Sequence, residues 1–297
     1  MSKNNLIQLY DSSAKVKQIG DSLQLHGQKI HLNGLIGSSL SFVVQSLFKK
    51  SEFPFLVVLN DKEEAAYYLN DLEQMVGEED VLFYPGSYRR PYQIEDTDNA
   101  NVLLRAEVLN RINSRKKPAV VVTYPEALFE KVVTKKELDK NTLKVAVGDQ
   151  ISIEFINEVL FEYEFKRVDF ITEPGEFSVR GGIIDVFSFS NDNPYRIEFF
   201  GNEVDSIRSF DVETQLSIEK QKKIAIIPNV ENKFFQENRE SFLDYIHQNT
   251  IVFIQNTELL ISKLEKLFDK ADDIFKNLNA TIKHVPPEKI FLHQKEF

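Results

Sequence analysis

Residues 175–211 carry the most specific chemical pattern of this sequence, arginines beside a phenylalanine. Side chains alternate between the two faces of a strand, so Arg196, Glu198 and Phe200 share one face and apolar residues take the other. Arg180 lies opposite apolar neighbours in a preceding strand, and we expect it on the same outward face. Arginines beside an exposed aromatic ring are typical of protein-binding hot spots.

The alternative is an ordinary amphipathic hairpin in which Glu198 neutralises Arg196. Exposed charges and scattered apolar surface residues are common in folded proteins, so alternation alone does not decide between the two interpretations. The hot-spot interpretation expects Arg196 and Phe200 to face outward, so that alanine at either position weakens binding without unfolding the domain.

A second candidate is a nucleotide phosphate loop that follows a predicted strand at residues 29–32. Such a loop has the pattern G-x-x-x-x-G-K-[ST], in which amides hold the phosphates, the lysine reaches the outer ones and the hydroxyl holds magnesium. Gly34 matches the first glycine and Ser41 the hydroxyl. Ser39 stands at the second glycine, however, and Leu40 at the lysine. We therefore predict a degenerate loop without ATP binding, the alternative being weak anion binding at the helix N-terminus.

The composition argues against most other chemistry. The chain has no cysteine, which excludes disulfides, thiolate metal sites and cysteine nucleophiles. Its five histidines are scattered, and the five-residue spacing of His26 and His31 suits neither one helix face nor one strand face. The net charge of −10 disfavours broad binding to phosphate backbones. We expect no catalytic residue, no metal site and no cofactor.

The order of elements predicts an α/β fold. Short apolar strands alternate with helices over the first 140 residues, which is typical of a parallel sheet with helices on both faces. Turn-forming pairs between residues 167 and 218 indicate a small α+β domain. Apolar runs return from residue 223, and the simplest account is that the first sheet resumes. Predicted strands lie at residues 53–61, 81–84, 119–123, 250–254 and 290–293, and predicted helices at 40–50, 62–76, 99–114, 152–165 and 258–278.

These elements give a fold prediction with an insertion. We expect a parallel-sheet, degenerate P-loop NTPase-like domain at residues 1–140, an inserted small α+β domain at 141–222, and a return to the first domain at 223–297. The last apolar run favours a fragment of a longer protein. No apolar run approaches the ~20 residues of a membrane span and the N-terminus has no secretory signal, so we expect a cytoplasmic location.

Several motifs carry a resemblance to known bacterial repair proteins. The segments GEFSVRGGIIDVF, PYRIEFFGNEVDSIRSFD and the following Glu213-Thr214-Gln215 resemble a segment shared by the excision-nuclease B subunit (UvrB) and the transcription-repair coupling factor (Mfd). The resemblance extends more loosely over residues 30–297. UvrB keeps an intact phosphate loop and a tyrosine-rich hairpin that clamps DNA, whereas here the loop is broken and residues 86–98 are short. The chain therefore resembles the N-terminal UvrB-like module of a transcription-repair coupling factor.

The resemblance implies a function for the inserted domain. In the family this domain binds UvrA, the A subunit of the excision nuclease, and the contact residues match Arg180, Arg196 and Phe200. The full-length family protein is an ATP-dependent DNA translocase that also binds RNA polymerase, through regions that do not fit in this chain. We therefore expect a monomer that recruits UvrA but neither hydrolyses ATP nor moves on DNA. The alternative is a nucleotide-dependent damage-recognition subunit resembling UvrB.

Overall fold

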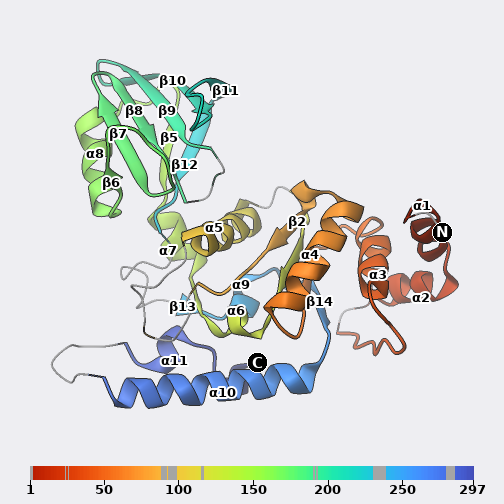
Figure 1. The fold of residues 1–297 in the computed structure, drawn as a ribbon. Helices are drawn as coiled ribbons and strands as arrows, with labels where there is room; N and C mark the ends of the chain where they lie inside the picture. Colours follow the sequence, from red (N-terminus) through yellow and green to blue (C-terminus); the bar gives the residue numbers. More distant parts are fainter. Residues whose placement is uncertain are drawn as a thin grey trace. The chain divides into compact units, whose positions relative to one another are not determined.

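A computed structural model describes two compact units, each built from separate stretches of the chain (Figure 1). Unit 1 consists of Met1–Gly86, Arg111–Lys131 and Ser241–Phe297, and unit 2 of Ser87–Asn110 and Val132–Glu240. The expected domain division at residues 140 and 222 remains a prediction. The structure describes residues 3–23, 25, 27–87, 92, 99–114, 117–189, 191, 193–229, 239–278 and 285–297.

A four-stranded parallel sheet forms the centre of unit 1. Its strand order is β14-β1-β3-β2, with β1 at Phe55–Val58, β2 at Val81–Phe83, β3 at Val120–Thr123 and β14 at Ile251–Ile254. Every residue of β1 and β3 is buried, as continuous apolar runs in parallel strands require. The predicted parallel sheet is confirmed, and β14 returns to it from far along the sequence.

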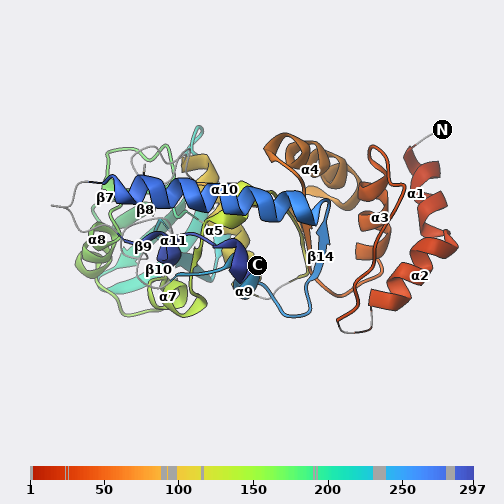
Figure 2. The same cartoon turned by 90° about the horizontal axis from the view of Figure 1, so that it is seen from below.

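Helices pack around this sheet. The carboxylate of Asp61 accepts a hydrogen bond from the amide of Glu64, so it caps α4, which packs against β2 and β3. The long helix α10 begins just after β14 (Figure 2). It packs against α6, where Lys263 pairs with Glu126 at 3.1 Å. The helices are α1 (Lys3–Asp11), α2 (Ala14–Leu23), α3 (Ser39–Phe48), α4 (Lys62–Val76), η1 (Glu78–Asp80), α6 (Pro125–Phe129), α9 (Phe242–Tyr245), α10 (Thr257–Lys276), α11 (Pro287–Ile290) and η4 (Gln294–Glu296), while α5 (Asn99–Ser114) has residues in both units.

Unit 2 contains a six-stranded mixed sheet in the order β11-β10-β9-β8-β7-β6. One face of this sheet carries an apolar row across four strands, in which Ile184, Ile197 and Ile207 are buried and Val179 is half-buried. The ring of Phe161 on α8 meets that of Phe177 edge-on. The strands are β6 (Lys166–Arg167), β7 (Glu176–Arg180), β8 (Ile183–Val186), β9 (Tyr195–Phe200), β10 (Glu203–Phe210) and β11 (Ser217–Gln221), and α8 spans Ile153–Glu162.

Smaller elements complete unit 2. Helix α7 spans Lys135–Lys140, β5 (Leu143–Ala146) pairs with β12 (Lys223–Ile226), and β4 (Val132–Val133) pairs with β13 (Arg239–Glu240). The apolar run that begins at Ile224 was expected to rejoin the first sheet. It forms an antiparallel ladder with β5 instead, so only β14 continues the first sheet among the described strands.

Two further strand predictions are wrong. Residues 29–32 have no regular structure, because they lie between two glycines of positive φ, Gly27 and Gly34, and have no strand beside them. A P-loop NTPase-like arrangement, which needs a strand before the loop, is therefore not confirmed. Residues 290–293 end a helix and then form only an isolated bridge between Phe291 and Glu130. Within the described ranges, no helix is long and apolar enough to cross a membrane.

The turn before β7 gives a test of the packing in unit 2. Gly175 has φ +88, and a Cβ atom there would lie 2.6 Å from Cζ of Phe189. Gly175→Ala should lower the free energy of unfolding by about 2–4 kcal/mol, because backbone strain and a clash with a buried ring add together. Urea unfolding measures this change.

The matched control is Gly181→Ala, at φ +58 with open space around the new methyl group. This variant carries the backbone strain alone and should lose only about 1 kcal/mol. Equal losses for the two variants would contradict the clash with Phe189.

Candidate protein-binding site

The strand register brings the predicted site residues to one face of the sheet in unit 2. Arg180 pairs with Ile183 on β8, and Ile183 pairs with Glu198 on β9. Directly paired residues share a face, and so do residues two apart along a strand, so Arg180 lies on the face of Arg196, Glu198 and Phe200. We call this surface the open face, because Phe200 and part of Arg180 are exposed on it, whereas the opposite face carries the apolar row and α8.

A buried carboxylate holds the two arginines. Asp185 on β8 is only 2% exposed. Its Oδ1 accepts a hydrogen bond from Nε of Arg196 at 2.7 Å and its Oδ2 one from Nη2 of Arg196 at 2.8 Å. Nη2 of Arg180 pairs with the same Oδ2. The hydrogen bond to Asp185 raises the pKa of Arg196, so this guanidinium stays charged.

The expectation that Arg196 faces outward is wrong. Its side chain is 15% exposed, its guanidinium lies 4.4 Å from the ring centre of Phe210, and Nη2 donates to Oε1 of Gln215 at 3.3 Å. Alternation assigns the correct face, but it does not reveal that the loop after β10 and an aromatic ring cover part of that face. Arg196 is therefore a structural residue with a limited exposed edge.

Glu198 is not the ion-pair partner of Arg196, although its charge also helps to raise the pKa of that arginine. Its carboxylate forms an ion pair with Arg208 of β10 and accepts a hydrogen bond from the hydroxyl of Ser206. The amphipathic-hairpin alternative named the wrong partner, because Asp185 lies directly opposite Arg196 in the register. Asp185 was missed by the sequence interpretation, although an acidic residue inside the apolar run of β8 is a signal that could have indicated it.

Phe200 is the exposed aromatic residue of the open face. It ends β9 beside the turn at Gly201, and 83% of its surface is exposed. Arg180 is also partly exposed, with 43% of its side chain open to solvent. A large exposed ring on the same sheet face as two ordered guanidinium groups is suited to binding a protein surface.

The four positions of the predicted phosphate loop lie at the start of α3. Gly34 has φ +80 in an exposed segment. The hydroxyl of Ser39 accepts a hydrogen bond from the amide of Ile36 at 2.6 Å and donates to the carbonyl of the same residue at 2.7 Å. Leu40 is buried, and the buried hydroxyl of Ser41 lies 3.4 Å from Oδ2 of Asp71. Both hydroxyl groups therefore have partners within the protein.

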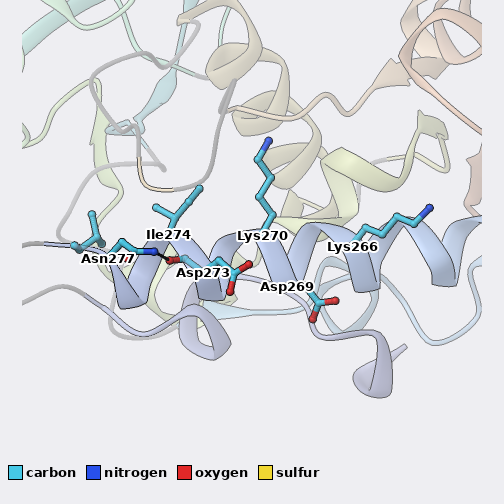
Figure 3. Close-up of a pocket in the computed structure, with 7 residues that line it drawn as sticks. Lys266, Asp269, Lys270, Asp273, Ile274 and Asn277 are labelled. Atoms are coloured by element: carbon cyan, nitrogen blue, oxygen red, sulfur yellow. Dashed lines mark hydrogen bonds between the residues drawn. The ribbon is translucent and has the colours of Figure 1, made fainter.

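Two other kinds of site were considered in the described part of the chain, a metal centre and the hollow beside α10. No group of three histidine, aspartate or glutamate side chains there could hold a metal ion. A hollow beside α10 is lined by residues of this helix and the turn that follows it, including Lys266, Asp269, Lys270 and Asp273 (Figure 3). Charges of both signs alternate along it, which is typical of a solvated helix face. Of residues 86–98, only 86, 87 and 92 are within the described ranges.

The part of unit 2 that carries the open face matches a known protein family. Residues 143–232 match the family described as "UvrB interaction domain". This match includes Arg180, Asp185, Arg196 and Phe200. It therefore covers β5 to β12 and the whole cluster around the buried carboxylate.

Relatives with similarity over more of the chain are transcription-repair-coupling factors. The protein of Bacillus subtilis is 33% identical over 66% of this chain and 17% of its own length, and that of Myxococcus xanthus is 29% identical over 75% of this chain and 19% of its own length. The protein of Rickettsia bellii is 29% identical over 70% of this chain and 18% of its own length. This chain thus spans less than a fifth of these relatives. Residues 143–232 are a UvrB interaction domain, and the chain is a UvrB-like module of the transcription-repair-coupling-factor family.

Proposed function

We propose that this chain binds UvrA through the open face and serves as the UvrA-recruiting module of a transcription-repair coupling factor in nucleotide excision repair. The observation that carries the proposal is the exposed Phe200 on the same sheet face as Arg180 and Arg196, within residues 143–232 that match the UvrB interaction domain. Contacts of the whole family protein with RNA polymerase and DNA are assigned to regions outside this chain.

The ion pairs of the open face support this proposal energetically. Arg180 and Arg196 are already ordered by Asp185, so little side-chain entropy is lost when a partner binds. Two guanidinium groups share one carboxylate, which leaves one positive charge in the cluster. A partner with acidic groups at this point would gain favourable charge complementarity and a faster association rate.

The proposal assigns no ATPase activity to this chain. Leu40 offers no positive charge for a phosphate, and Ser39 and Ser41 form hydrogen bonds within the protein. These features favour a binding module over the alternative of a nucleotide-dependent damage-recognition subunit.

Phe200→Ala tests the binding surface. We expect the affinity for UvrA to fall by about 30-fold or more, as for a central aromatic anchor. The melting temperature should not change, because the ring of Phe200 is exposed. Calorimetric titration with UvrA and thermal unfolding measure the two quantities. Phe155→Ala is the control, since Phe155 is exposed on α8 at the opposite face; undiminished affinity in Phe200→Ala would refute the site.

The two arginine variants should behave differently. Arg196→Ala removes the bidentate partner of buried Asp185 and should lower the free energy of unfolding by about 3 kcal/mol or more in addition to weakening UvrA binding. Arg180→Ala leaves that partner in place, so it should cost at most about 1 kcal/mol of stability while it weakens binding. Urea unfolding and affinity are measured on both variants. Identical stability of wild type and Arg196→Ala would contradict the structural role of this arginine.

ATP binding separates the module from the enzyme alternative. We expect no saturable binding of a fluorescent ATP analogue up to about 1 mM, which corresponds to a binding free energy of only about −4 kcal/mol. Leu40→Lys should not restore binding, because the preceding strand is absent and both serine hydroxyls are engaged. UvrB serves as the positive control. Micromolar binding by the wild type would revive the damage-recognition alternative.

A further inference from the structure

Both arginines that pair with Asp185 also lie against a phenylalanine ring. The guanidinium of Arg196 lies 4.4 Å from the ring centre of Phe210. That of Arg180 lies 5.5 Å from the ring centre of Phe170. Phe210 is fully buried, whereas Phe170 is 66% exposed. The ring beside Arg180 is therefore open to solvent next to a residue of the proposed binding surface.

The segment that carries Phe170 lies along the open face of β7. Glu176, Ser178 and Arg180 occupy alternate positions of this strand, so they share that face. The hydroxyl of Ser178 donates to the carbonyl of the residue before Phe170 at 3.2 Å. The buried carboxylate of Glu176 accepts hydrogen bonds from the amides of residues 172 and 173 at 2.8 and 3.2 Å. The ring of Phe170 therefore belongs to an ordered segment, with Arg180 as its neighbour on the strand.

An apolar anchor fixes the same segment directly after the ring. Ile171 is 2% exposed and packs in a buried cluster with Phe187 and Phe210. Phe210 is also the ring beside Arg196, so the rings that support the two arginines are connected through this cluster. The buried Ile171 limits how far the ring of Phe170 can move away from Arg180.

Asp185 holds Arg180 less completely than it holds Arg196. Arg196 pairs with both carboxylate oxygens, through Nε and Nη2, whereas Arg180 pairs with one oxygen through Nη2. A guanidinium that is held at one nitrogen can still turn about that contact. The face of a phenyl ring attracts a cation within about 6 Å of its centre, so Phe170 limits this remaining rotation. Arg180 is then ordered before a partner binds, and less entropy is lost on binding.

We propose that Phe170 is a positioning residue of the UvrA-binding surface, whose ring holds the guanidinium of Arg180 in the orientation that binds UvrA. The inference rests on the proposed function, in which Arg180 belongs to the contact with UvrA. It adds a fourth residue to the three predicted ones, and this residue acts through Arg180. The alternative is that the exposed ring of Phe170 itself packs against UvrA.

Two substitutions of Phe170 separate the attraction of the ring for a cation from its apolar area. Phe170→Leu keeps an apolar side chain but removes the ring, so the affinity for UvrA should fall about fivefold. Phe170→Tyr keeps the ring and should bind within about twofold of wild type. Calorimetric titration measures both affinities, and thermal unfolding shows whether each variant is folded. Phe155→Leu is the matched control, because Phe155 is exposed on α8 at the opposite face.

A double-mutant cycle with Arg180→Ala tests whether the ring acts through Arg180. Without the guanidinium there is nothing for the ring to hold, so Phe170→Leu should change the affinity of the Arg180→Ala variant by less than about 1.5-fold. Phe200 and Arg196 remain in both backgrounds, so binding should stay measurable. A loss as large in this background as in the wild type would overturn the inference, because the ring would then contact UvrA directly.

The outcomes also separate this inference from the proposed function. If the wild type does not bind UvrA, the proposed function itself fails. If the wild type binds and Phe200→Ala is weakened, but Phe170→Leu binds within about 1.5-fold of wild type, this inference is overturned and the function stands. Equal losses in Phe170→Leu and Phe170→Tyr would overturn it as well, because the tyrosine ring still attracts a guanidinium.

Discussion

The buried carboxylate of Asp185 is the interaction on which the open face depends. A charged group that is 2% exposed is costly unless it is fully paired, and here Arg180 and Arg196 provide the pairing from two flanking strands. The ion pairs therefore link β7, β8 and β9 on the open face, beside the buried cluster of Ile171, Phe187 and Phe210, while the opposite face is held by apolar packing. The same residues that stabilise the sheet also present positive charge to solvent, so stability and binding cannot be varied independently at Arg196.

The two-residue period of a strand was sufficient to predict on which sheet face each side chain lies, but not which residue each arginine pairs with. The two-residue repeat of a strand assigns Arg180, Arg196 and Phe200 to one face, and the structure has them there. The partner of an arginine depends on the register between strands, which the turns at Gly181 and Gly201 fix, and a single sequence does not reveal that register. This is why Glu198 seemed the natural partner of Arg196, and why Asp185 and Arg208 were missed.

The strand predictions were correct for segments that are fully buried in the sheet. The runs in β1 and β3 are apolar at every position and lie inside the first sheet, so composition alone identified them. Residues 29–32 alternate polar and apolar side chains, as a half-buried strand would, but two glycines bound the segment and no strand lies beside it. A strand needs a neighbour for its hydrogen bonds, and that requirement is not visible in four residues. The phosphate-loop interpretation depended on this strand, so the structure gives no confirmation of a P-loop NTPase-like fold.

The hydroxyl of Ser39 has a thermodynamic consequence for unit 1. It accepts a hydrogen bond from the amide of Ile36 and donates one to the carbonyl of the same residue, so it closes the turn that leads into α3. The hydrogen bonds that close this turn are therefore formed within the chain and need no ligand. Ligand-linked stabilisation rises with the logarithm of ligand concentration, and the hydrogen bonds of Ser39 contribute no such dependence, because both partners belong to the same turn.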